Sequence, residues 1–96
     1  MTIAMIRHTV ANFDAWKSGY DAHEPARRAA GCTSASVSRA AATEGATEVF
    51  VQLDFPDAAA AQGFLNNPAL AEAMQAAGVI GIPDIHIAEP VLSTTY

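Results

Sequence analysis

The period-two alternation of residues 47–55 constrains the fold more strongly than any other feature of the chain. One face of this segment carries Val49, Val51, Leu53 and Phe55, and the other carries Glu48, Phe50, Gln52 and Asp54. Because successive side chains of an extended strand point to opposite faces, the pattern predicts a strand that is buried on one side.

Three further segments are predicted to be strands, namely residues 3–10, 33–40 and 84–92. The first is rich in β-forming residues and has apolar side chains on both faces. The second has a serine face, which is typical of an edge strand. Residues 42–45 are predicted to form a turn and residues 79–83 an apolar loop, since both segments contain residues that interrupt regular structure.

Two helices are predicted between these strands. Phe13, Trp16, Tyr20 and His23 recur at spacings of three and four, which places them on one helical stripe. Asn12 or Asp14 can cap this first helix, which kinks or restarts at Pro25 and ends at Gly31. The second helix begins at residues 56–57 and restarts at residues 67–68, where an asparagine and a proline suit the N-cap and the first helical position. It ends at Gly78.

The resulting order, β-α-β-β-α-β, predicts an α+β ferredoxin-like plait in a single domain of residues 1–96. The four strands form an antiparallel sheet in the order 4-1-3-2, with the helices on one face. The other face is left bare although it carries apolar groups, so we expect a second copy of the chain to cover it as a homodimer. Composition agrees, because 22 of the 96 residues are alanine and few are large and apolar.

Charge and cysteine content exclude several classes of protein. The net charge of −5 lacks the basic footprint of a nucleic-acid-binding protein. We find neither a secretory signal nor a long apolar span, so we expect a cytoplasmic protein without membrane contact. The single cysteine, Cys32, excludes an internal disulfide and is expected to be a small buried residue.

Several segments also resemble a known family. They are Asn12–Trp16 after the opening strand, Phe55–Asp57, Ala61–Phe64, Asn67–Leu70 and Gly78–Pro83. Together they make the chain similar to the dimeric α/β-barrel superfamily, especially its antibiotic-biosynthesis-monooxygenase-like domains. The resemblance implies that two sheets face each other to close a barrel and that each protomer holds a ligand pocket between helices and sheet. It also implies cofactor-free monooxygenase, cyclase or isomerase chemistry. Haem degradation is not expected, because residues 58–77 lack the histidine of the haem-degrading members.

Two histidines are the candidate catalytic bases, because imidazole titrates near neutral pH. His8 lies on the first predicted strand and His86 on the fourth, which are neighbours in the predicted order. If residues 8 and 86 pair, their side chains share a face at roughly 5 Å between Cβ atoms, with Gln52 and Asp54 nearby. Such a group suits a proton relay or a divalent metal, but no metal is expected because the close spacing of typical ligands is missing. Alternatively, each histidine is an ordinary hydrogen-bonded strand residue.

A pocket for an apolar ligand is predicted beside these histidines. Its expected binding residues are Trp16, Tyr20, His23, Phe50, Phe64 and Met74. An aromatic stripe is also compatible with plain core packing. Arg27, Arg28 and Arg39 can orient a carboxylate or phenolate, but they are expected to be solvated surface groups.

Three functional hypotheses follow. The first is a homodimeric, cofactor-free monooxygenase- or cyclase-like enzyme that acts on an apolar aromatic or polyketide-like molecule with a histidine base. The second is a non-catalytic dimer of the same fold that binds a small molecule. The third is a purely structural dimer without a pocket.

Overall fold

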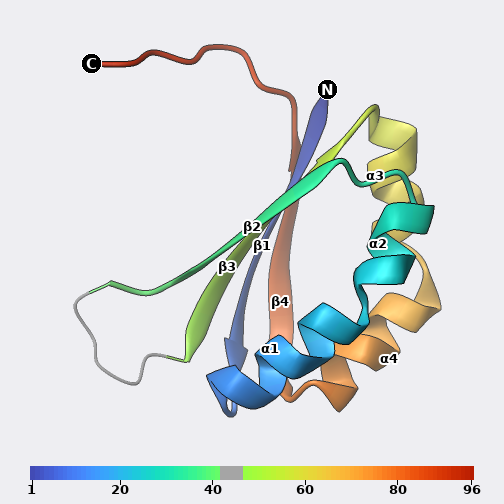
Figure 1. Ribbon diagram of the computed structural model, residues 1–96, viewed down its shortest axis with the longest axis vertical. Coiled ribbons are helices and arrows are strands. Elements are labelled where there is room, and N and C mark those ends of the chain that lie inside the picture. The colour runs from blue at the N-terminus through green and yellow to red at the C-terminus, as the bar shows by residue number, and fades with distance from the viewer. Residues whose placement is uncertain (42–46) are drawn as a thin grey trace.

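The computed structural model describes residues 1–41 and 47–96, so the turn predicted at residues 42–45 lies outside the described residues. The chain folds into a four-stranded sheet with four helices on one side of it (Figure 1). In chain order the elements are β1 (Thr2–Val10), α1 (Phe13–Ala22), α2 (Glu24–Ala29), β2 (Ser34–Arg39), β3 (Glu48–Phe55), α3 (Ala58–Leu65), α4 (Pro68–Ala76) and β4 (Val79–Ala88).

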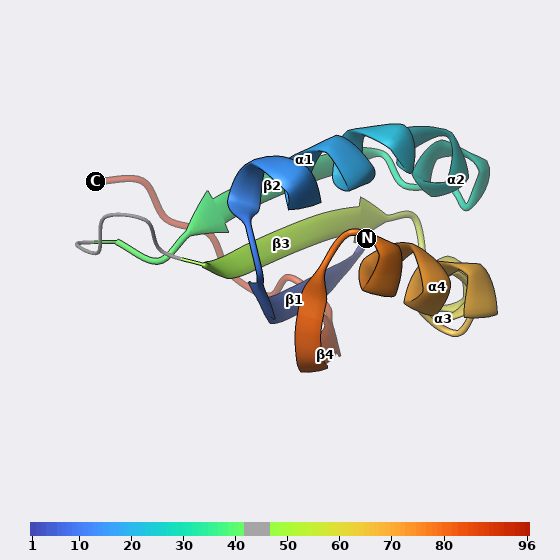
Figure 2. The same ribbon diagram turned by 90° about the horizontal axis from the view of Figure 1, so that it is seen from below.

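The sheet is antiparallel throughout and its strand order is β2-β3-β1-β4. This arrangement confirms the predicted order 4-1-3-2 and the edge position of residues 33–40. The predicted faces of β3 are confirmed as well, because its buried side chains are Val49, Val51, Leu53 and Phe55. These side chains pack with Ile6 and Val10 of β1 and with the helices, so the core lies between the sheet and the helical layer (Figure 2).

Each of the two predicted helices is divided into two, at the places where the sequence carries a break. Asn12 accepts a hydrogen bond from the amide of Ala15 and begins α1. Pro25 lies in the first turn of α2, where a missing amide hydrogen costs little. Asn67 caps α4 through the amide of Ala69, as predicted. Gly31 and Gly78 follow α2 and α4 with φ of 96° and 89°, a backbone region that glycine adopts without strain.

The prediction for the last strand is wrong at both ends. Residues 79–83 are part of β4 rather than a loop, and the strand ends at Ala88 rather than at residue 92. Glycine and proline suggested a loop, but an edge strand tolerates both at a bulge. The register of β4 against β1 shifts there, from Arg7 opposite Asp84 to Thr9 opposite Ile80, and Gly81 has a φ of 72°. At the other end, Pro90 cannot donate a ladder hydrogen bond.

The far face of the sheet has no helix over it (Figures 1 and 2). Met5 and Phe50 are 45% and 41% exposed there. Arg7 lies on this face between two carboxylates. It forms one ion pair with Asp84 and a second one, of 3.4 Å, with Glu48. The face is therefore a mixture of apolar side chains and a small ion-pair network. No helix in residues 1–41 and 47–96 has both the length and the apolar character needed to cross a membrane.

Candidate functional site

A cavity lies between the helices and the sheet, at the level of the middle of β1. Its volume is about 50 Å³. The sheet contributes Ile6, His8, Val51 and Leu53. The first helix pair contributes Trp16, Gly19 and Tyr20 from α1, His23 from the residue after it and Arg27 from α2. The second helix pair contributes Phe64 from α3, Leu70, Ala73 and Met74 from α4, and Ala77 from the residue after it. Most of these side chains are apolar, so the few polar groups among them define the chemistry of the site.

His8 is the polar group on the sheet side of this cavity. The alternation of β1 places it on the helix-facing side together with Ile6 and Val10, and it is only 6% exposed. Both ring nitrogens, Nδ1 and Nε2, are buried and have no hydrogen-bond partner among the described residues. Buried polar atoms are normally hydrogen-bonded, and an unpartnered one requires a bound group or a functional reason. A cavity of this size accepts water, which ligand binding would displace.

Burial also determines the protonation state of His8. Desolvation lowers the pKa of His8 below the ordinary value for imidazole, because the charged form loses its hydration inside the protein. No described carboxylate forms an ion pair with this ring. His8 is consequently neutral at pH 7, and a neutral imidazole has one nitrogen free to accept a proton.

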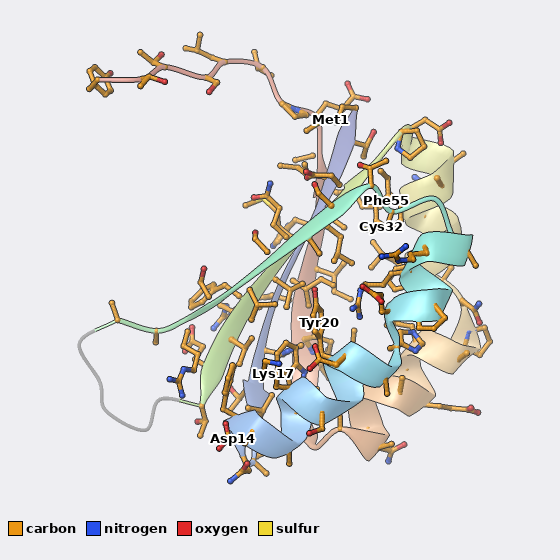
Figure 3. All side chains as sticks on the ribbon, in the orientation of Figure 1. Met1, Asp14, Lys17, Tyr20, Cys32 and Phe55 are labelled. Carbon is orange, nitrogen blue, oxygen red and sulfur yellow. The ribbon has the colours of Figure 1, made fainter. Side chains whose placement is uncertain are left out.

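The aromatic stripe of α1 faces His8 across the cavity. Trp16 is 4% exposed, and its ring meets the His8 ring edge-on with 5.4 Å between centroids. Tyr20 stacks on Trp16 one turn later, with 5.1 Å between centroids and an interplanar angle of 26°. Figure 3 shows Tyr20 in the space between α1 and the sheet. The predicted stripe is thus part of the core and part of the cavity wall at once.

Arg27 was expected to be a solvated surface residue, and this expectation is wrong. Its side chain is only 8% exposed. The guanidinium carbon lies 3.7 Å from the centroid of the Tyr20 ring, and Nη1 donates a hydrogen bond of 2.7 Å to the Tyr20 carbonyl. Arg27 continues the stripe, because the spacings from Tyr20 to His23 and from His23 to Arg27 are three and four residues, as within the stripe itself. This spacing is the sequence signal that predicts an inward position for Arg27.

The two other arginines and Cys32 lie outside the cavity. Arg28 is exposed and pairs with Glu24 at 3.6 Å, and Arg39 lies over the Phe13 ring at 4.3 Å. Cys32 is half-buried, and its thiol donates to the carbonyl of Ser34. Burial raises the pKa of this thiol, which disfavours the reactive thiolate.

His86 and Phe50 do not lie where the sequence hypothesis placed them. His86 pairs with Met5 on the uncovered face of the sheet, so the predicted pairing of residues 8 and 86 is wrong. A shift of one residue in register moves a side chain to the other face, and the bulge in β4 leaves His8 without a paired residue on that strand. Phe50 also faces away from the helices, whereas Trp16, Tyr20, His23, Phe64 and Met74 line the cavity as predicted.

A wider groove adjoins the cavity between the α1–α2 and α3–α4 pairs. It has a volume of about 480 Å³ and shares His23, Phe64 and Leu70 with the cavity wall. The rings of His23 and Phe64 lie tilted at 48° to each other, with 6.0 Å between centroids. The pKa of His23 is lowered by burial and by the positive charge of Arg27. The two aromatic rings therefore lie where the groove borders the cavity.

Among the described residues, the side chains that could bind a metal ion are dispersed. Within residues 1–41 and 47–96, no three or more His, Cys, Asp or Glu side chains lie close enough together to hold a metal ion. The group of His8, His86 and Asp54 that the sequence suggested is divided between the two faces of the sheet.

The fold matches several solved structures although their sequences differ greatly. A mutant of SnoaB, a cofactor-independent oxygenase from Streptomyces nogalater, has a TM-score of 0.76 at 12% identity, over 96% of this chain and 94% of that one. A monooxygenase from the ActVA-Orf6 gene of Streptomyces coelicolor, solved with nanaomycin D, has a TM-score of 0.69 at 17% identity, over 99% and 91%. A protein of unknown function from Nitrosomonas europaea has a TM-score of 0.71 at 20% identity, over 99% and 93%.

No protein-family model matches the chain, and no curated protein matches its sequence. The ferredoxin-like fold of the antibiotic-biosynthesis-monooxygenase structures is confirmed for this chain. The predicted resemblance therefore holds at the level of the fold.

Proposed function

We propose that the protein is a cofactor-free monooxygenase- or cyclase-like enzyme that acts on an apolar aromatic or polyketide-like molecule, with His8 as the base. The observation that carries this proposal is the His8 ring, whose two nitrogens are buried without a partner among the described residues, in a cavity with aromatic walls. The fold supports the oxygenase kind, since one solved structure that it matches is described as a cofactor-independent oxygenase.

The chemistry begins with a proton transfer to His8. A neutral, desolvated imidazole takes a proton from a phenol or an activated methylene, and the resulting anion is spread over the aromatic system. In the monooxygenase case this anion reacts with dioxygen, which is the oxidant. One oxygen atom becomes the new carbonyl and the other leaves as water, so that CH₂ plus O₂ gives C=O plus H₂O. In the cyclase case the same anion attacks a carbonyl of the substrate and no oxidant is consumed.

Binding requires the cavity to open. A cavity of roughly 150 Å³ holds one benzene molecule, so a space of about 50 Å³ does not admit an aromatic ring as it stands. The adjoining groove supplies the missing room if His23 and Phe64 move apart. Met74 also lines the cavity, and its flexible thioether chain adapts readily to a new shape.

His8 is tested with a defined hydroxyanthrone probe. We would measure oxygen uptake by 1,8-dihydroxyanthrone above its spontaneous oxidation, for the wild type, His8→Gln and His86→Gln. Loss of a general base typically costs about 100-fold or more, and we expect that loss only for His8→Gln. Full activity of His8→Gln, or an equal loss in His86→Gln, contradicts the assignment. Tight binding of the probe by the wild type without turnover identifies a binding protein instead.

The second part of the proposal is that two copies pair through the uncovered face of the sheet. Met5 and Phe50 lie there exposed, beside a shallow depression of about 360 Å³. Exposed apolar side chains that are rimmed by polar residues commonly mark an interface. Phe50→Asp places a charge in the expected contact and should give a 10 kDa monomer by light scattering. Gln75→Glu, on the outer surface of α4, is the matched control and should leave the dimer intact. A wild type that stays monomeric at high concentration rules this interface out.

A further inference from the structure

Arg27 is a buried cation without an acidic partner among the described residues. The one hydrogen bond that its side chain makes to the described part of the chain runs from Nη1 to the Tyr20 carbonyl. A guanidinium has five N–H donors in a planar fork, so the described residues leave most of these donors unpaired. Two acidic side chains close to it in the sequence have partners of their own, since Asp21 pairs with Lys17 at 2.7 Å and Glu24 with Arg28 at 3.6 Å.

The surroundings make this arrangement costly unless something compensates the charge. Arg27 is only 8% exposed and borders the cavity opposite apolar and aromatic side chains. A buried charge loses its hydration, and pairing with an opposite charge restores part of that loss. The face of the Tyr20 ring, 3.7 Å away, supplies some stabilisation but no hydrogen-bond acceptor. A planar anion with two oxygens matches the fork best.

We propose that Arg27 and the Tyr20 ring form an anion-recognition site for an aromatic carboxylate that binds in the cavity. The carboxylate would lie on the free edge of the guanidinium, the aromatic body would lie along Trp16, and its far end would reach His8. Trp16 connects the two ends, since its ring contacts both Tyr20 and His8. This inference rests on the proposed function in one respect, namely that the cavity opens to accept a ligand.

A size-matched pair of ligands tests the inference without any need for turnover. We would titrate the protein with 2-naphthoate and with 2-naphthamide, which differ in charge but hardly in shape, and follow binding by calorimetry. A hydrogen bond to a charged group corresponds to about a tenfold difference in affinity or more, so the wild type should prefer naphthoate by about tenfold. Equal affinity for the two ligands overturns the proposal.

Neighbouring arginine variants locate the source of the preference. Arg27→Gln should lose the preference for naphthoate while its affinity for naphthamide changes little. Arg28→Gln removes the same charge from the next residue, which is exposed, and should keep the preference. If Arg27→Gln fails to fold, Arg27→Met retains the apolar stem of the side chain and replaces it in the comparison. A preference that survives in the Arg27 variant, or disappears in Arg28→Gln, overturns the proposal.

The outcomes separate this inference from the function proposed above. If neither ligand binds the wild type, the carboxylate inference fails, while the proposed function is still decided by oxygen uptake with 1,8-dihydroxyanthrone. If both ligands bind equally well, the cavity is a binding site and only the carboxylate specificity is wrong.

Discussion

The close approach of α1 to the end of α4 at Gly19 leads to a quantitative prediction about stability. A Cβ added at Gly19 would lie 2.8 Å from the Cβ of Ala77 and 3.5 Å from its Cα. Carbon atoms pack best at roughly 3.5–4.0 Å, so Gly19→Ala forces the two helices apart. Overpacking of this kind costs about 1–3 kcal/mol, and the better helix propensity of alanine offsets about 1 kcal/mol. We expect Gly19→Ala to lower the free energy of unfolding by about 0–2 kcal/mol.

Gly63 provides the matched control, since it also lies in a helix but has nothing within 4 Å of its added Cβ. Gly63→Ala should therefore gain stability from helix propensity alone, up to about 1 kcal/mol. Urea unfolding of both variants at one protein concentration gives the two free energies. The difference between them isolates the steric cost and should be about 1–3 kcal/mol, which corresponds to roughly 4–8 °C in Tm for each kcal/mol.

A double variant checks that the clash is the cause. Ala77→Gly removes the opposing methyl group, so it should be less harmful in the Gly19→Ala background than in the wild type, by an interaction energy of about 0.5–3 kcal/mol. Equal stability changes for Gly19→Ala and Gly63→Ala, or strictly additive effects of Gly19→Ala and Ala77→Gly, would refute the reasoning. The pair also matters for the site, because Gly19 and Ala77 both line the cavity.

Two further predictions concern protonation and helix capping. Because burial lowers the pKa of His8 in the folded state, only the unfolded chain binds this proton just below pH 6.5, and stability falls as the pH falls through that window. As the pH is lowered from about 7.5 to 5.5, urea unfolding should therefore show that the wild type loses more stability than His8→Gln. An equal loss in the two proteins contradicts a lowered pKa of His8. Asn67→Ala removes the cap of α4 and should cost about 1 kcal/mol in thermal unfolding, whereas Asn66→Ala, which removes no capping bond, should cost less.

The location of the cavity follows in part from features that the sequence carries locally. The stripe of Trp16, Tyr20 and His23, on α1 and the residue after it, was readable as a periodicity, whereas residues 3–10 have apolar side chains on both faces and only the structure shows which face carries His8. Each periodicity assigns a side chain to one face of its own element, and the order of elements then places those faces together. Five of the six predicted binding residues line the cavity for this reason. Phe50 does not, because its own strand alternation directs it to the uncovered face.

By itself, the sequence determined the helices, the breaks at Pro25 and Pro68, the strand order and the strands apart from the bounds of β4, because these depend on local periodicity, on caps and on rules for connecting neighbouring elements. The tertiary structure alone decided the register between β1 and β4, which separates His86 from His8. It also decided the burial of Arg27 against Tyr20. Both depend on contacts between distant or differently oriented segments, and a bulge or the docking angle of a short helix changes such contacts without changing any local pattern.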